Sequence, residues 1–263
     1  MTAGEQREQA MCKGFVCLAI AVLAALAFAA TAAATPRVTF QATAIPIPGF
    51  PDTGDILGAG TEVEVQVTIS GTEYGGFPSP LVGLTIYSPR GVQLTPKGFG
   101  SCAPSVLTAD GPPGCPKSSR AGPTGEGLGV VSFGGERVNE KVSIQSFFSP
   151  TGGLTFYVLG KTPTFFEILE KGYWTTASAP YGPKLVVEVP LVETVPGADD
   201  ASILSFKVKV GAAYRHGKKT VSYITLPESC PKAGAPLKAE LKFMNGETVT
   251  SAYRQPCPKH KAS

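Results

Sequence analysis

The chain has 263 residues and a formal net charge of +3 at pH 7, with 16% charged residues, 31 glycines and 24 prolines. Glycine and proline together make up about a fifth of the chain, which is typical of many short strands joined by tight turns. The sequence contains no catalytic, metal-binding or nucleotide-binding motif, and this excludes the enzyme classes that such motifs define.

Residues 1–34 predict an export signal. Lys13 is followed by a long uncharged stretch in which large apolar residues lie among alanines. Ala32 and Ala34 supply the small residues that cleavage requires, so we expect the mature chain to begin at Thr35. An uncleaved membrane anchor is the alternative, because the stretch reaches the ~20 apolar residues that span a bilayer. Alanine dominates its C-terminal half and is only weakly hydrophobic, which favours cleavage.

Strands are predicted along the mature chain by apolar and polar residues that alternate with period two. The pattern is clearest over 61–70, where Val63, Val65 and Val67 alternate with polar residues, and over 204–210. Weaker signals cover 38–44, 81–87, 127–133, 138–148, 154–159, 165–176, 185–189 and 220–226. Since helical periodicity is almost absent after the signal, we expect an all-β body with about a dozen strands.

The alternation stops between residues 97 and 125, which are rich in Pro, Gly and Ser. A structureless loop of this length is uncommon in a compact domain, so the segment could mark a domain boundary. The part before it holds too few strands for a stable core of its own, however. We therefore predict one domain over 35–263, an antiparallel β-sandwich of jelly-roll or immunoglobulin-like type that follows an N-terminal signal helix.

Four cysteines follow the signal: Cys102, Cys115, Cys230 and Cys257. An even count in an exported chain predicts disulfides. Of the three connectivities, we favour Cys102–Cys115 and Cys230–Cys257, because each closes a modest loop and the first would staple the 97–125 segment to itself. Zinc is the alternative, but no C-x-x-C pair occurs and only two histidines are available, so we expect no metal and no cofactor.

The last apolar residues predict a hairpin with a defined register. A two-residue Asn245-Gly246 turn would scatter the apolar side chains over both faces of the sheet. A three-residue loop that begins at Met244, with Gly246 in the left-handed region, puts them on one face, and we expect this loop. The predicted pairs are Leu241 with Val249 and Leu237 with Tyr253.

Tyr173 and Trp174 are the best candidates for ligand binding. Neighbours in a strand point to opposite faces, so one ring of the pair is exposed unless another segment covers it. An exposed ring of this kind stacks on sugars in many binding modules, which suggests a cell-wall or other glycan as partner. The simpler alternative is that Trp174 belongs to the core.

Glycosidase chemistry requires two carboxylates about 5.5 Å apart for retention, or roughly 6.5–9.5 Å apart for inversion. Glu167 and Glu170 point to opposite faces of a regular strand and cannot cooperate unless a bulge intervenes. Glu62 and Glu64 share a face, as any solvent-side pair in an amphipathic strand does. We therefore assign no catalytic residue.

Charge is unevenly placed along the mature chain. Residues 35–205 hold ten Lys/Arg and fifteen Asp/Glu, whereas residues 206–263 hold eleven and three. The basic C-terminal strands could form a face for an anionic polymer. The favoured alternative is that strands of opposite charge lie side by side and neutralise each other. Export argues against nucleic acid as a partner.

The mature chain contains five short sequence motifs that include Cys, Pro or Gly. They are a Cys…Gly-Pro-Pro-Gly-Cys-Pro loop (102–116), Pro-Gly-Ala-Asp-Asp-Ala-Ser (196–202), Pro-Glu-Ser-Cys-Pro (227–231), Lys-Phe-Met-Asn-Gly-Glu-Thr (242–248) and Pro-Cys-Pro (256–258). Together they resemble a group of uncharacterised exported proteins of actinobacteria. The resemblance spans most of the mature chain and implies a cell-envelope location. Its motifs are structural, so it transfers no activity or binding residue.

These features predict an exported, non-catalytic module with a binding or structural role. We expect the protein to be secreted or associated with the cell envelope. Anchoring through the N-terminal helix is the alternative. Membrane contact is expected only if that segment stays uncleaved. The rival hypothesis is a carbohydrate-active enzyme on a jelly-roll-like sandwich.

Overall fold

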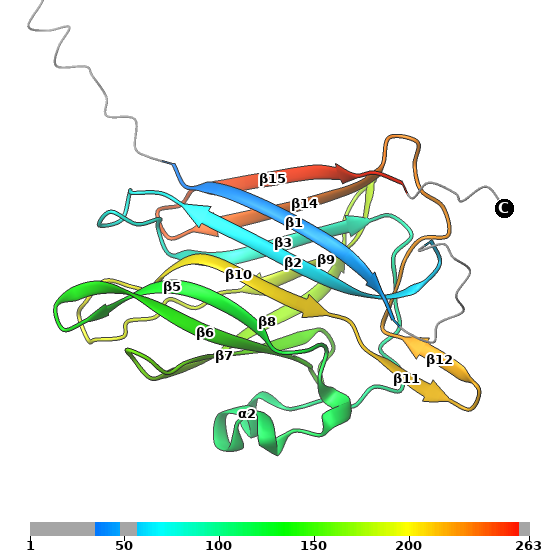
Figure 1. The fold of residues 1–263 in the computed structure, drawn as a ribbon, viewed down its shortest axis with the longest axis horizontal. Helices are drawn as coiled ribbons and strands as arrows, with labels where there is room; N and C mark the ends of the chain where they lie inside the picture. The colour runs from blue at the N-terminus through cyan, green and yellow to red at the C-terminus, as the bar shows by residue number, and fades with distance from the viewer. Residues whose placement is uncertain (1–34, 48–56, 258–263) are drawn as a thin grey trace, which may run out of the picture. The chain divides into compact units, whose positions relative to one another are not determined.

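The computed structural model describes residues 35–47 and 57–257 (Figure 1). The predicted signal at residues 1–34 lies outside the described residues. The body is almost entirely β, as the alternation predicts, and its sheet is antiparallel throughout. Within the described residues, no helix combines the length and the apolar character needed to cross a membrane.

The strands are β1 (Arg37–Pro46), β2 (Gly60–Ser70), β3 (Leu81–Pro89), β4 (Gln93–Leu94), β5 (Gly125–Phe133), β6 (Glu136–Phe148), β7 (Leu154–Gly160), β8 (Phe166–Thr176), β9 (Tyr181–Glu188), β10 (Ser202–Val210), β11 (Ala213–His216), β12 (Lys219–Ser222), β13 (Ile224–Thr225), β14 (Ala235–Phe243) and β15 (Thr248–Gln255). The long strands follow the predicted segments, whereas β4 and β11 were not predicted and the predicted segment 220–226 is divided between β12 and β13. The short helices are α2 (Pro104–Asp110), η1 (Pro112–Gly114) and η2 (Lys117–Ser119).

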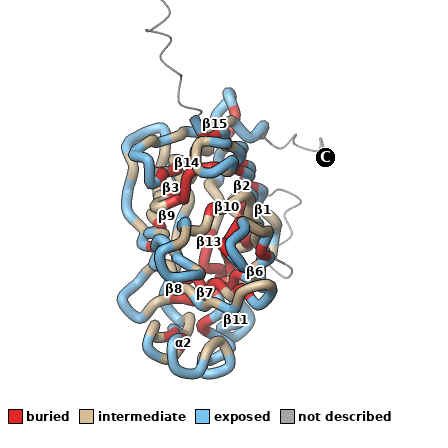
Figure 2. Tube along the Cα trace, turned by 90° about the vertical axis from the view of Figure 1, so that its left-hand side faces the viewer, coloured by how far each residue is buried: buried red, intermediate tan, exposed pale blue. Residues whose placement is uncertain are grey.

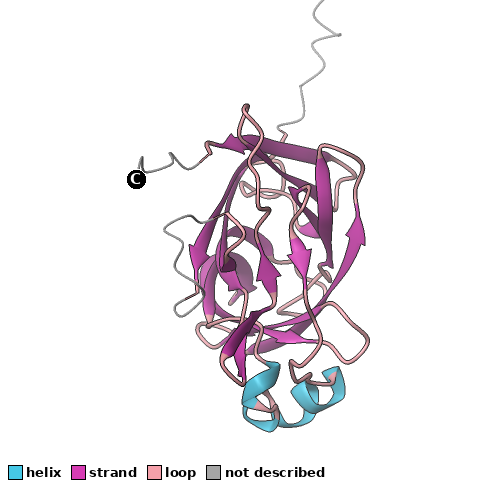
Figure 3. Ribbon diagram, turned by 90° about the vertical axis from the view of Figure 1, so that its right-hand side faces the viewer, coloured by secondary structure: helices cyan, strands magenta, loops and turns pink. Residues whose placement is uncertain are grey.

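Thirteen of these strands join one sheet in the order β15-β14-β3-β9-β8-β7-β6-β5-β10-β2-β13-β4, with β1 paired to β2; β11 and β12 form a separate ribbon. The stretch from β5 to β9 is a meander in which each strand pairs with the next. The sheet curls until its far ends meet, and Figure 3 shows strands on several sides of a shared interior.

Tyr253 of β15 joins the two ends of the curled sheet. Its hydroxyl donates to the Ala42 carbonyl oxygen of β1 and accepts from the Ala42 amide, both at 2.6 Å. The Tyr253 ring also packs on Phe40, with ring centroids 5.8 Å apart. One side chain therefore supplies the polar contacts of a strand junction that has no backbone ladder of its own.

The main core lies inside the curl, where the alternating apolar side chains of facing strands meet. Figure 2 shows where the buried residues lie along the chain trace. Its central residues include Val67 of β2, Leu154 of β7 and Leu241 of β14, each at most 1% exposed. The core forms here because most strands have one apolar and one polar face, so curling removes mainly the apolar faces from water.

The expected structureless segment between residues 97 and 125 instead contains α2, η1 and η2 and covers the outer face of the sheet. A second apolar cluster forms beneath it from Cys102, Leu107, Phe147 and Tyr157. The Cys102 amide also donates to the Phe148 carbonyl oxygen at 2.9 Å. The segment lacks alternation because it packs through a helix and turns.

Both favoured disulfides are present, with Cα–Cα distances of 5.5 Å for Cys102–Cys115 and 5.8 Å for Cys230–Cys257.

The final hairpin has the predicted register. Leu241 pairs with Val249 and Leu237 pairs with Tyr253. Gly246 has a φ of 86°, as a three-residue loop requires.

Replacing Cys102 and Cys115 together by alanine should lower the free energy of unfolding by about 3 kcal/mol, because the bridge restricts the unfolded chain. Urea unfolding followed by circular dichroism measures this change. The Cys230/Cys257 double variant is the matched control: its bridge spans 27 residues rather than 13, so its loss should be slightly larger. An unchanged unfolding midpoint in both variants would contradict the expectation.

Candidate ligand-binding site

The curled sheet encloses a cavity of about 490 Å³. This volume falls within the ~300–1,000 Å³ typical of small-molecule sites. The lining is almost wholly apolar and comes from strands on every side of the interior. It includes Val63 and Val65 of β2, Leu84 and Ile86 of β3, Leu128 of β5, Val142 of β6, Phe156 of β7, Ile168 and Trp174 of β8, Val187 of β9 and Phe206 of β10.

The interior is not filled by its own side chains. Leu128, Val142, Ile168 and Phe206 line the cavity and remain only half-buried. In a close-packed core such side chains would keep almost no accessible surface. Their remaining surface therefore faces the cavity.

Two glycines lie beside Val142, which lines the cavity. The cross-strand neighbours of Val142 are Gly127 on β5 and Gly160 on β7. A Cβ on Gly127 would lie 2.8 Å from Val142 Cγ2, and a Cβ on Gly160 would overlap the Phe166 ring, so the two glycines make room for these cavity-lining side chains.

One end of the cavity is built from turns and proline-rich segments. The Arg90 amide donates to the Pro180 carbonyl oxygen at 3.3 Å, which joins two of these turns. Pro227, Ser229, Cys230 and Pro231 line the same end, and the Cys230–Cys257 bridge joins this segment to the chain just after β15. Arg90, Pro180 and Ser229 line the cavity and are exposed, so this end opens to solvent.

Glu140 of β6 is one of two carboxylates that line the cavity within the described residues. It is fully buried and accepts hydrogen bonds from the amides of Lys161, Thr162 and Thr164 at 3.1, 3.0 and 3.0 Å. These amides belong to the β7–β8 connection. The carboxylate is therefore compensated by the backbone and holds this connection against β6.

Glu170 of β8 is the other carboxylate. It occupies an inward position of β8, between Ile168 and Gly172, directly opposite Phe156 of β7. The described residues provide no hydrogen bond or ion pair to it. Glu170 is only partly exposed, and protein atoms surround its carboxyl group. Because burial disfavours the charged form of the carboxyl, the pKa of Glu170 rises to about 7.

Tyr173 and Trp174, the predicted binding pair, lie on opposite sides of the sheet. Trp174 lines the cavity, and its Nε1 is buried without a hydrogen bond of ordinary geometry. The indole nitrogen nevertheless interacts with the Tyr223 hydroxyl. Burial raises the pKa of Tyr223 to about 12, and the interaction with Trp174 lowers this pKa by a smaller amount. Tyr173 is 47% exposed on the outer face. The two residues therefore do not form one site.

The outer face of β3 and β14 carries a cluster of tyrosine, lysine and glutamate whose polar groups satisfy one another. The Tyr87 hydroxyl donates to Glu240 at 2.6 Å, and Lys238 Nζ donates to the same carboxylate at 2.7 Å. Lys238 Nζ also lies 3.8 Å from the Tyr87 ring centroid. Because these contacts are internal, they indicate a structural role across β3 and β14.

The uneven charge along the chain is partly balanced between neighbouring strands. Lys207 and Lys209 of β10 lie 3.2 and 3.5 Å from the two carboxylate oxygens of Glu64 on β2. These contacts match the alternative in which strands of opposite charge lie side by side.

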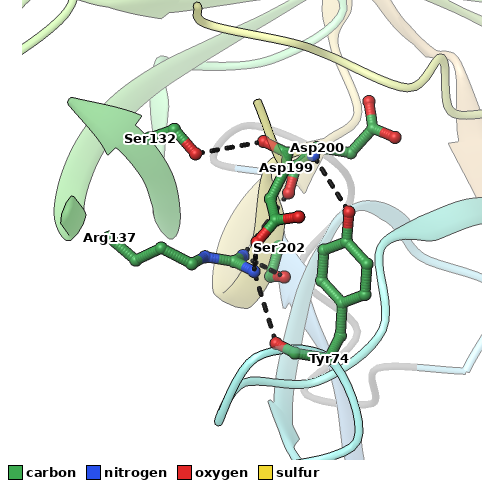
Figure 4. Close-up of polar contacts among 6 residues, drawn as sticks. All are labelled: Tyr74, Ser132, Arg137, Asp199, Asp200 and Ser202. Atoms are coloured by element: carbon green, nitrogen blue, oxygen red, sulfur yellow. Dashed lines mark hydrogen bonds and ion pairs between the residues drawn. The ribbon is translucent and has the colours of Figure 1, made fainter. Parts of the chain in front are cut away.

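A second polar cluster surrounds Arg137 (Figure 4). Its guanidinium donates to Ser202 at 2.9 Å, lies 3.4 Å from Asp199 and sits over the Tyr74 ring, 4.9 Å from the centroid. The Asp200 amide donates to the Tyr74 hydroxyl at 3.1 Å. The 196–202 motif is thus tied to β6 and to the β2–β3 connection, and the cluster is structural. The described residues contain no group of three or more His, Cys, Asp or Glu that could hold a metal.

The sequence already placed Glu167 and Glu170 on opposite faces, and the structure confirms this. Glu167 accepts a hydrogen bond from Tyr157 on the outer side, while Glu170 lines the cavity. The importance of Glu170 was missed. The available signal was a charged residue at an apolar position of an alternating strand.

Replacing Glu140 by alanine should lower the free energy of unfolding by about 3 kcal/mol or more, because three buried amides would lose their acceptor. Urea unfolding at neutral pH measures the loss. Glu126→Ala, at an exposed position of β5, is the control and should change stability by less than about 0.5 kcal/mol. Equal effects of the two substitutions would contradict the role assigned to Glu140.

Glu170 should make the protein less stable as the pH rises. Because its pKa rises from 4.5 to about 7 on folding, the folded state binds the proton more tightly. The stabilisation is therefore complete below about pH 4.5 and is lost as the pH approaches and passes about 7. Relative to Glu170→Gln, the wild type should lose about 3 kcal/mol between about pH 4 and pH 8.

Urea unfolding of both proteins at the two pH values measures this difference. Glu167→Gln, on the outer face of the same strand, controls for loss of a carboxyl from β8. A gap between wild type and Glu170→Gln that stays constant with pH would show that Glu170 titrates normally.

Comparisons with protein-family models, curated proteins and solved structures found no match to this chain.

Proposed function

We propose that the protein is an exported, non-catalytic binding protein that holds a lipophilic small molecule inside its curled sheet. The observation that carries this proposal is the apolar cavity of about 490 Å³, which opens to solvent at the end lined by Arg90 and Ser229. Sites for small molecules are commonly concave and apolar, with few polar groups. This cavity has that composition.

The energetics favour a ligand with an apolar body. A molecule that buries about 400 Å² of apolar surface gains on the order of 10 kcal/mol from leaving water. Loss of translational and rotational freedom offsets at least about 4 kcal/mol of this gain, which leaves at most about 6 kcal/mol and a dissociation constant on the order of tens of micromolar or weaker. The half-buried cavity side chains gain packing contacts from the same ligand.

The location and fold type form part of the proposal. The predicted signal peptide favours secretion or residence in the cell envelope, and two disulfides are typical of an oxidising compartment. We retain the sandwich description in the sense that two halves of one curled sheet face each other across the cavity.

A carbohydrate-active enzyme is less favoured. Sugars need polar partners for their hydroxyl groups, and the cavity wall is apolar. Of its two described carboxylates, Glu140 is already held by three backbone amides, so Glu170 has no free partner for acid–base work. Tyr173, exposed on the outer face, keeps glycan binding as a second proposal.

The purified protein should bind Nile red, a neutral lipophilic dye, in a saturable way with a dissociation constant on the order of tens of micromolar or weaker. Val142→Trp should weaken binding at least about tenfold, because the larger ring enters the cavity between two glycines. Dye fluorescence measures both affinities.

Ser143→Trp is the matched control, since Ser143 is the exposed neighbour of Val142 on β6. It should bind the dye like the wild type. Circular dichroism confirms that both variants fold. No saturable binding by the wild type, or release of reducing ends from a cell-wall polysaccharide, would overturn the proposed function.

A further inference from the structure

Glu170 is an ionisable residue in the wall of a cavity that is otherwise almost wholly apolar. Within the described residues, the cavity wall holds one other carboxylate, Glu140, and one basic side chain, Arg90. Glu140 is occupied by backbone amides, and Arg90 is exposed at the open end. Glu170 alone faces the interior without a partner.

The elements beside Glu170 bring no compensating charge. On β7 its direct neighbour is Phe156, and the cavity residues on the β9 side are Leu185, Val187 and Val189. Strands β2, β3, β5, β10 and β14 contribute no ionisable side chain to the cavity. Glu140 on β6 and Arg90 after β3 are the titratable groups that share the space.

A carboxylate in such a position is stabilised by a cation. Burying an unpaired charge costs several kcal/mol, whereas a charge-assisted hydrogen bond from an ammonium group offsets much of that cost. A neutral ligand would gain only an ordinary hydrogen bond, and a fatty acid would place a second negative charge beside the first. Phe156, Phe166 and Trp174 line the same cavity, and aromatic rings attract a cation that approaches their faces.

We infer that the ligand of the cavity is a lipophilic amine whose ammonium group pairs with Glu170 while its apolar body fills the space between the facing strands. This inference rests on the proposed function and adds to it the chemical class of the ligand and the residue that recognises it.

The pairing predicts a defined pH dependence. The free carboxyl has a pKa of about 7, and an ammonium partner holds it ionised, so binding in more acidic solution must release a proton. The affinity for the amine should therefore fall up to about tenfold per pH unit below about pH 7. A neutral ligand of the same shape should show no such slope.

The test compares decylamine with decanol, which share one alkyl chain and differ in the charge of the head group. Displacement of Nile red measures both affinities, and the fluorescence of Trp174, the single tryptophan of the chain, reports entry into the cavity. At about pH 8, decylamine should bind at least about tenfold more tightly than decanol.

Glu170→Gln should remove this preference and the pH slope, because the amide keeps the shape and loses the charge. Glu167→Gln, on the outer face of β8, should retain both. Nile red binding by each variant confirms that its cavity is formed.

The outcomes separate the two proposals. If decanol binds as tightly as decylamine, or if Glu170→Gln keeps the preference for the amine, the inference is overturned and the lipophile-binding function stands. If neither alkyl ligand nor the dye binds the wild type, both proposals fail.

Discussion

The structure depends on a single constraint, that most of the main strands have one apolar face and one polar face. In a flat sheet the apolar faces would stay in water, whereas curling the sheet turns them toward one another. The contact between Tyr253 and Ala42 completes the curl, because it joins strands that share no backbone ladder. The enclosed interior and its cavity both follow from this closure.

A disulfide, a short helix and a polar cluster stabilise the outer face. The Cys102–Cys115 bridge and α2 cover β6 to β8, and Arg137 holds the 196–202 motif. At the open end of the cavity, the Cys230–Cys257 bridge fixes segment 227–231. Several motifs that stand out in the sequence thus have a structural place, and one of them forms part of the cavity rim.

Natural sequences break local rules mainly at functional sites. Glu170 breaks the alternation of β8, and nothing in the described fold compensates its charge. Glu140 also carries a charge inward, but three backbone amides satisfy it. The difference between these two carboxylates is the reason that one is interpreted as structural and the other as a recognition residue.

The sequence by itself predicted the long strands and the register of the last hairpin, and it favoured the disulfide pairing that the structure has. Period-two alternation, loop closure and turn geometry act over short distances, so they can be recognised in the chain. Only the tertiary structure decided that α2 packs on the sheet, that Trp174 and Tyr173 serve opposite sides, and that Glu170 faces an open cavity. These features depend on which strands face each other across the curl and on how much space their side chains leave, and residues far apart in sequence set both.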